Sequence, residues 1–168
     1  VAAIAAAALL WADLTNVFVW LCLAVLLVFG LTGFADDYVK VKKHTPDAMT
    51  AKMKLFLQFA TALAVVWIVT AQTPPDVRFG VTIPYFHSLL NLGWFYLPFA
   101  MVVIAGTSNA VNLSDGLDGL AGGLSLIAFS AFALIAFVTG IPVMNTVSGV
   151  FIPGTVEVAI ICSAAAGA

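Results

Sequence analysis

Residues 16–35, NVFVWLCLAVLLVFGLTGFA, carry no charged side chain and are followed at once by residues 36–43, DDYVKVKK. A helix that crosses the hydrocarbon core of a bilayer needs roughly 20 predominantly apolar residues. The first segment is therefore predicted to be a membrane-spanning helix. The second is predicted to be a charged segment at the membrane surface.

The whole chain has the same apolar character. Of its 168 residues, 63% are hydrophobic and 8% are charged, and the mean hydropathy is +1.14. A soluble domain is about one quarter charged. The composition therefore excludes a soluble globular protein and predicts an all-α fold, a polytopic bundle of transmembrane helices. Cys22 and Cys162 lie in apolar runs and define no disulfide framework or metal site.

Four full spans and two partial ones are expected. The full spans are predicted near 16–35, 54–71, 95–111 and 119–140, and the partial spans at 1–11 and 157–168. Residues 36–53 and 108–118 are predicted as charged loops, and 72–94 as a longer loop that could hold a small β-hairpin. Because both ends of the chain lie in apolar runs, we expect 1–168 to be a single integral membrane domain, a fragment lacking N- and C-terminal parts.

The distribution of charge predicts the orientation. Five of the six Lys and Arg residues lie in or beside one loop: Lys40, Lys42, Lys43, Lys52 and Lys54. The positive-inside rule puts that loop in the cytoplasm. Two spans later the chain returns to the same side, so the acidic segment 108–118 is expected there too. The tryptophans are expected near the opposite, outer ends of their spans: Trp11, Trp20, Trp67 and Trp94.

Two acidic clusters should therefore share one membrane face. Asp36 and Asp37 are spaced to neighbour Lys40 on a helix. In residues 108–123, SNAVNLSDGLDGLAGG, three polar side chains recur every third residue: Asn112, Asp115 and Asp118. Crowded carboxylates repel one another unless a cation lies among them, and Mg²⁺ combines one or two carboxylates with water and substrate phosphates. The pattern predicts phosphoryl chemistry at the inner membrane face.

Other interpretations of these residues stay open. The first acidic pair could simply be solvated at the end of a span, and Asp118 could be the N-cap of the next helix. The lysines at 42, 43, 52 and 54 could act as topology signals. A transporter is a rival function, although the predicted spans hold no charge in their interiors, and a structural membrane subunit is another.

The sequence resembles a known enzyme family at these residues. GFADDYVKV (33–41) and NAVNLSDGLDGLAGG (109–123) are similar to two cytoplasmic signatures of the polyprenyl-phosphate N-acetylhexosamine-1-phosphate transferases, and LLWADLTN (9–16) also matches. The likeness runs over essentially the whole chain. The run DDYVKVKK favours the muramoyl-pentapeptide branch over relatives that transfer other sugar phosphates, which remain the alternative.

The resemblance implies a reaction and its participants. It is the transfer of phospho-MurNAc-pentapeptide from UDP-MurNAc-pentapeptide to undecaprenyl phosphate, which yields lipid I and UMP with Mg²⁺ as the cofactor. The site would face the cytoplasm in the bacterial inner membrane. The lipid bilayer is an expected partner, a nucleic acid is not, and a homodimer is left open. Later family motifs would lie beyond Ala168.

The resemblance also implies roles for individual residues. Asp36, Asp37 and Asp115 would be catalytic, with Asp36 engaging the acceptor, and Asp37 and Asp115 would hold the metal. Asn112 and Asp118 would bind substrate. Lys40 is expected to bind a substrate phosphate on the basis of its charge and spacing alone.

Overall fold

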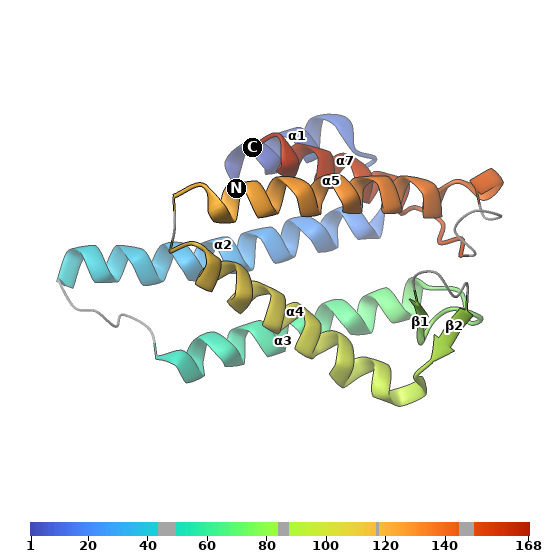
Figure 1. Ribbon diagram of the computed structural model, residues 1–168, viewed down its shortest axis with the longest axis horizontal. Helices are drawn as coiled ribbons and strands as arrows, with labels where there is room; N and C mark the ends of the chain where they lie inside the picture. The colour runs from blue at the N-terminus through green and yellow to red at the C-terminus, as the bar shows by residue number, and fades with distance from the viewer. Residues whose placement is uncertain (44–49, 84–87, 117, 145–149) are drawn as a thin grey trace.

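A computed structural model of the chain describes residues 1–43, 50–83, 88–116, 118–144 and 150–168. The described elements, in chain order, are α1 (Ala2–Trp11), α2 (Val17–Lys43), α3 (Ala51–Gln72), β1 (Gly80–Ile83), β2 (Ser88–Asn91), η1 (Gly93–Phe95), α4 (Tyr96–Ser114), α5 (Leu120–Gly140), η2 (Pro142–Met144) and α7 (Val156–Ala166). The prediction of an all-α bundle is confirmed (Figure 1).

Four of the described helices are long and apolar enough to cross a membrane, and they coincide with the four predicted spans. Two boundaries were wrong. The helix of the first span continues to Lys43, so the charged loop does not begin at residue 36, and α4 continues to Ser114, so residues 108–114 are helical rather than a loop. In α2 the pairing of Asp36 with Lys40, one turn apart, favours continued helix through the charged segment.

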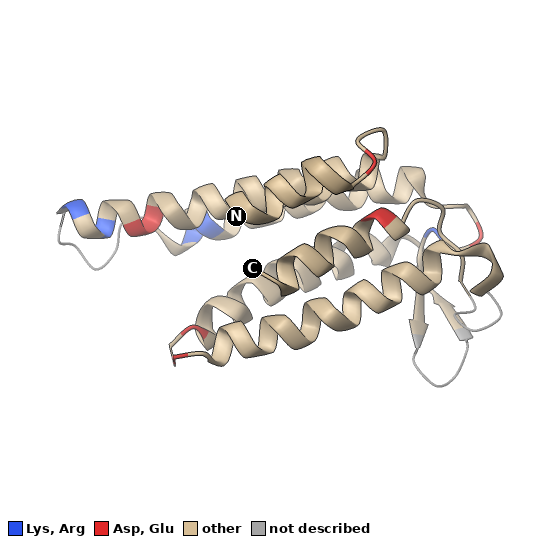
Figure 2. Cartoon of the chain, turned by 90° about the horizontal axis from the view of Figure 1, so that it is seen from above, with Lys and Arg blue, Asp and Glu red and all other residues tan. Residues whose placement is uncertain are grey.

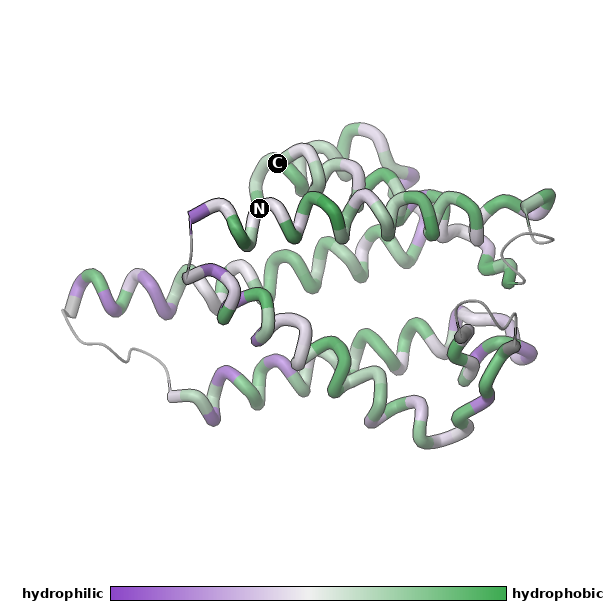
Figure 3. Tube along the Cα trace, viewed as in Figure 1, coloured by the Kyte–Doolittle hydropathy of each residue, from purple (hydrophilic) through white to green (hydrophobic). Residues whose placement is uncertain are grey.

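The helices form two packed groups. α5 packs against α7, and α1 lies beside α7, whereas α3 pairs with α4; α2 contacts both α3 and α7 and so connects the groups (Figure 1). A small buried cluster joins α1, α2 and α7 and contains Ala8, Val19, Leu23 and Ile161. Many large apolar side chains elsewhere face outward, as expected for helices surrounded by lipid, because lipid tails are as apolar as the side chains themselves. Figure 3 shows this apolar character along the middle of the helices.

Charged residues gather toward the two ends of the bundle (Figure 2). One end holds the C-terminal part of α2 with its acids and lysines, the start of α3, and the acidic turn between α4 and α5 (Figures 1 and 2). The two acidic clusters therefore lie at the same end of the bundle, as the span count predicts.

The opposite end holds the β-hairpin and a polar clamp. β1 pairs antiparallel with β2, with Gly80 opposite Asn91, which confirms the predicted hairpin. Nearby, Asn16 Nδ2 donates to the carbonyl oxygen of Gly154 at 2.8 Å, and Asn16 Oδ1 accepts from the backbone N–H of Phe18 at 2.8 Å. These bonds fix the start of α2 against the segment that precedes α7.

Candidate active site

The charged end of α2 holds a buried carboxylate that pairs with two lysines. The Asp36 side chain is 7% exposed, and its Oδ2 lies 2.6 Å from Nζ of Lys40 and 2.6 Å from Nζ of Lys54. Lys40 is one turn further along α2, whereas Lys54 belongs to the first turn of α3. Asp36 therefore links two helices, and two cations compensate its loss of hydration.

The neighbouring carboxylate is open. The Asp37 side chain is 77% exposed, and its Oδ1 lies 3.5 Å from Nζ of Lys40. Because consecutive helical residues point about 100° apart, Asp36 can be buried against α3 while Asp37 stays accessible. Two adjacent acids of the sequence thus have different environments: one is held by lysines and the other is available to a ligand.

Polar side chains at the start of α3 lie on one face of the helix. Thr50 caps the helix, since its side chain accepts a hydrogen bond from the backbone N–H of Met53 at 3.4 Å. Lys54 and Gln58 follow at a spacing of four residues, which places them on the same face of the helix. This face meets α2 through Lys54 and α4 through Gln58.

An amide pair joins α3 to α4. Asn109 Nδ2 donates to Gln58 Oε1 at 2.9 Å, and Gln58 Nε2 donates to Ser108 Oγ at 3.2 Å. Asn109 Nδ2 also donates to the carbonyl oxygen of Ala105 at 2.8 Å. The pair orients the last turns of α4, from which Asn112 projects one turn beyond Ser108.

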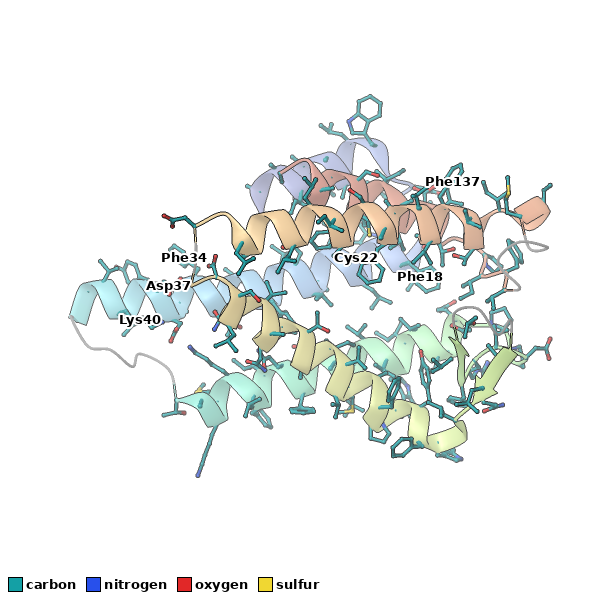
Figure 4. All side chains as sticks on the ribbon, in the orientation of Figure 1. Phe18, Cys22, Phe34, Asp37, Lys40 and Phe137 are labelled. Atoms are coloured by element: carbon teal, nitrogen blue, oxygen red, sulfur yellow. The ribbon has the colours of Figure 1, made fainter. Side chains whose placement is uncertain are left out.

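These side chains line one pocket of about 200 Å³ between α2, α3 and α4. We call it the polar pocket; its polar lining residues are Thr32, Asp36, Asp37, Lys40, Lys54, Gln58, Ser108, Asn109 and Asn112. Figure 4 labels Asp37 and Lys40 on α2 at this end of the molecule. The structure therefore brings together four of the predicted site residues, Asp36, Asp37, Lys40 and Asn112.

The other two predicted site residues lie beyond the pocket. Asp115 and Asp118 are not among its lining residues. α4 ends at Ser114 and Asp115 is its C-cap, so the three-residue repeat does not continue along one helix. The idea that Asp118 caps α5 was wrong: the N-cap is Gly119, at φ +76°, with no side-chain cap bond. A left-handed backbone favours glycine, and this explains why the helix is interrupted here.

The donors of the pocket can be compared with the needs of Mg²⁺. Among the described residues, no group of three or more His, Cys, Asp or Glu side chains is arranged to hold a metal ion. The crowding of carboxylates, which suggested a cation, is relieved at Asp36 by lysines. Asp37 supplies one accessible carboxylate, and Mg²⁺ commonly uses only one or two, together with water and substrate phosphates. The pocket thus fits an ion that arrives with a phosphate ligand rather than one held in a protein cage.

Sequence reasoning missed part of the lining. Lys54 was interpreted as a topology signal, but it pairs with Asp36 inside the pocket. The four further polar residues that were missed are Thr32, Gln58, Ser108 and Asn109. A signal was present in the sequence: polar residues recur four apart near the charged ends of three helices, as in Lys54 and Gln58.

Comparison with known proteins adds a family to this geometry. Residues 19–168 match the model of the family described as glycosyl transferase family 4. The chain is also similar to three proteins named phospho-N-acetylmuramoyl-pentapeptide-transferase. It is 44% identical to that of Caulobacter vibrioides over 168 residues, 40% to that of Oleidesulfovibrio alaskensis over 162, and 41% to that of Maridesulfovibrio salexigens over 162.

The matched region is nearly all of this chain but less than half of each relative. The alignments cover 95–96% of the chain and 45% of each of the three relatives. The polar pocket therefore consists of residues from a region that these proteins share.

Proposed function

The chain belongs to glycosyl transferase family 4, and from that premise we propose that it is the part of a transferase that holds the reacting phosphates. It is a multi-pass membrane protein. The proposed reaction moves phospho-MurNAc-pentapeptide from UDP-MurNAc-pentapeptide to undecaprenyl phosphate and releases UMP. The names of the three relatives support this choice. The observation that carries it is the polar pocket, with two lysines and an open carboxylate.

The charges of the pocket suit phosphate ligands. Lys40 and Lys54 both line it, and their side chains are 38% and 36% exposed, so each can reach a ligand while it contacts Asp36. Asp36 holds the two ammonium groups in place, so the lysine side chains lose less conformational entropy when a phosphate binds. In this proposal Lys40 and Lys54 bind substrate phosphates, and Asn112 donates a hydrogen bond from its amide.

The chemistry needs no strong base on the protein. A phosphate monoester has a second pKa near 6, so the acceptor is largely a dianion at neutral pH. Its oxygen attacks the phosphorus attached to the sugar, a new P–O bond forms, and the bond to UMP breaks with the electron pair leaving on UMP. Phosphoryl transfer depends mainly on positioning and charge neutralisation. The proposal is therefore a direct displacement, and trapping of a phosphorylated Asp36 or Asp37 would contradict it.

Mg²⁺ is the proposed cofactor. Asp37 would hold it from the polar pocket, and Asp115 is proposed as a second ligand by resemblance alone. When bound, the ion would neutralise charge that develops on the leaving phosphate.

An apolar cavity next to the polar pocket supports a lipid acceptor. It has a volume of about 480 Å³, and its lining includes Val25, Leu26 and Ile104. These residues lie about one helical turn from Phe29 and Ser108, which line the polar pocket. The lining thus changes from polar to apolar along α2, α3 and α4 away from the charged end, and α1, α5 and α7 complete the apolar cavity. Undecaprenyl phosphate likewise has a polar phosphate at one end and an apolar isoprenoid tail. We therefore propose that the tail occupies this cavity.

The proposed location follows from the lysines. Their concentration at the end of the bundle that holds the polar pocket favours a cytoplasmic position, and the substrates favour the bacterial inner membrane. A homodimer remains compatible with the chain.

The test is an assay of UMP release by the full-length protein in detergent with both substrates and Mg²⁺. We expect release that requires undecaprenyl phosphate and is lost in Asp37→Asn. Parallel assays with UDP-N-acetylglucosamine and UDP-MurNAc-pentapeptide separate the proposed reaction from that of a related sugar-phosphate transferase. Release with the former and not the latter would favour the related activity, and no release with either would overturn the proposal.

A further inference from the structure

A second pocket lies at the hairpin end of the bundle, far from the polar pocket. It has a volume of about 210 Å³ and lies between the end of α3, the segment before β1, and the start of α4. We call it the aromatic pocket; its lining includes Trp67, Thr70, Arg78, Phe79, Trp94 and Leu97. It combines one cation with three aromatic rings and, among the described residues, no acidic side chain.

Arg78 is the single arginine of the sequence. Its side chain is half-buried, and its Nε donates to the carbonyl oxygen of Thr73 at 3.4 Å. Within the described part of the chain, no carboxylate lies within ion-pair distance of Arg78. Its charge is therefore left for a ligand, with the forked Nη groups as donors that suit a phosphate.

The backbone around Arg78 is held in place by the hairpin. The N–H of Leu92 donates to the carbonyl oxygen of Phe79 at 2.9 Å, which joins the segments on either side of the two strands. Asn91 Oδ1 accepts from the N–H of Gly93 at 2.8 Å, and Gly93 has φ +53°, a left-handed turn that favours glycine. Trp94 follows Gly93 directly, so the turn fixes the backbone position from which the Trp94 side chain extends.

Aromatic rings line the same pocket as Arg78. Phe79 stacks on Trp94 with ring centroids 6.2 Å apart and an interplanar angle of 29°. Trp67 and Trp94 are 62% and 78% exposed and lie near the ends of their apolar spans. Tryptophan is enriched at the level of lipid headgroups, where its ring contacts both chains and water. The aromatic pocket is thus at the depth where a phospholipid carries its phosphate.

We propose that the aromatic pocket binds one anionic phospholipid, with its phosphate at Arg78 and its upper acyl chain against Trp67 and Leu97. The charge of the pocket selects the anionic headgroup, because a cation attracts anionic lipid at a membrane surface. The site is separate from the polar pocket and does not depend on the function proposed for it.

The test uses the tryptophans as reporters. The full-length protein is reconstituted in phosphatidylcholine vesicles with a rising mole fraction of dibrominated phosphatidylglycerol or dibrominated phosphatidylcholine, since bromine quenches tryptophan on contact. Subtracting the signal of a W67F/W94F variant isolates the pocket. We expect half-quenching at about a fivefold lower fraction of the glycerol lipid, the preference expected from one cation near the surface.

Substitutions test whether Arg78 causes the preference for phosphatidylglycerol. Arg78→Gln should bring the two curves together, whereas Arg78→Lys should keep a preference because it keeps the charge. Lys42→Gln removes one cation at the other end of the bundle and should leave the preference unchanged. Equal quenching by the two lipids in the wild-type protein would overturn the proposal without any variant. A preference that survives in Arg78→Gln would also overturn it.

Discussion

Lys54 Nζ lies 2.6 Å from Oδ2 of Asp36, and this contact joins the first turn of α3 to the last turns of α2. The two residues are 18 positions apart, so no single-helix pattern would pair them. Lys40 approaches the same oxygen from within α2. The buried carboxylate thus determines where two ammonium groups lie, and both are in place in the pocket before any ligand arrives.

The open carboxylate should be essential for turnover and dispensable for folding. Replacing Asp37 with Asn removes the charge of a side chain that is 77% exposed, so the melting temperature should change little. In the proposal Asp37 would hold Mg²⁺, and loss of one group that stabilises charge in the transition state typically lowers kcat by about 10²–10³-fold. The measurement is UMP release by full-length protein, with Mg²⁺ titrated from zero. Wild-type activity at every Mg²⁺ concentration would remove Asp37 from the site.

The amide pair should contribute to stability through coupling between its two members. Gln58→Leu and Asn109→Leu each break the bond between the two amides, although Asn109 keeps its bond to the Ala105 carbonyl and Gln58 keeps its bond to Ser108; the double variant removes both groups. Hydrogen bonds between membrane helices contribute about 0.6 kcal/mol on average, so a coupling free energy of about that size is expected from a double-mutant cycle. Unfolding in mixed detergent micelles measures it. Strictly additive effects of the two substitutions would show that the pair does not hold α3 against α4.

The hydrogen bonds of Asn16 at the hairpin end should affect the stability of the protein and not its binding of substrates. Asn16→Ala removes one bond to the Gly154 carbonyl and one to the N–H of Phe18. A cost of about 1–2 kcal/mol in the free energy of unfolding is expected, with KM for both substrates unchanged at a permissive temperature. Thr15→Ala in the same exposed turn is the matched control and should cost less. An equal effect of both substitutions would contradict the assigned role of Asn16.

The fold could be predicted from sequence because hydrophobic length alone identifies spans in a bilayer. The end of α2 could not be predicted in the same way, because a charged run such as DDYVKVKK is typical of a loop. The pairing of Asp36 with Lys40 favours helix there. The same limit applies to the site. Asp37 and Asn112 stand out in the sequence as polar residues near apolar runs, but Lys54 acquires its place only through a contact between helices.

The turn after α4 shows another limit of sequence patterns. On a continuous helix a spacing of three residues would gather Asn112, Asp115 and Asp118 along one face, but α4 ends at Ser114. Gly119 then adopts a left-handed backbone at the start of α5. Local backbone preference at glycine decided the geometry here, and the periodicity of the polar residues did not.

Two lysines two residues apart allow the most direct test of the central claim, that the pocket between α2, α3 and α4 binds the reacting phosphates. Lys54 lines the pocket, whereas Lys52 on the same first turn of α3 does not. Loss of one hydrogen bond to a charged group is worth about 1.5–3 kcal/mol. In UMP release by the full-length protein, Lys54→Gln should therefore lower kcat/KM about 10- to 100-fold and Lys52→Gln should leave it unchanged. Equal activities of the two variants would contradict the claim.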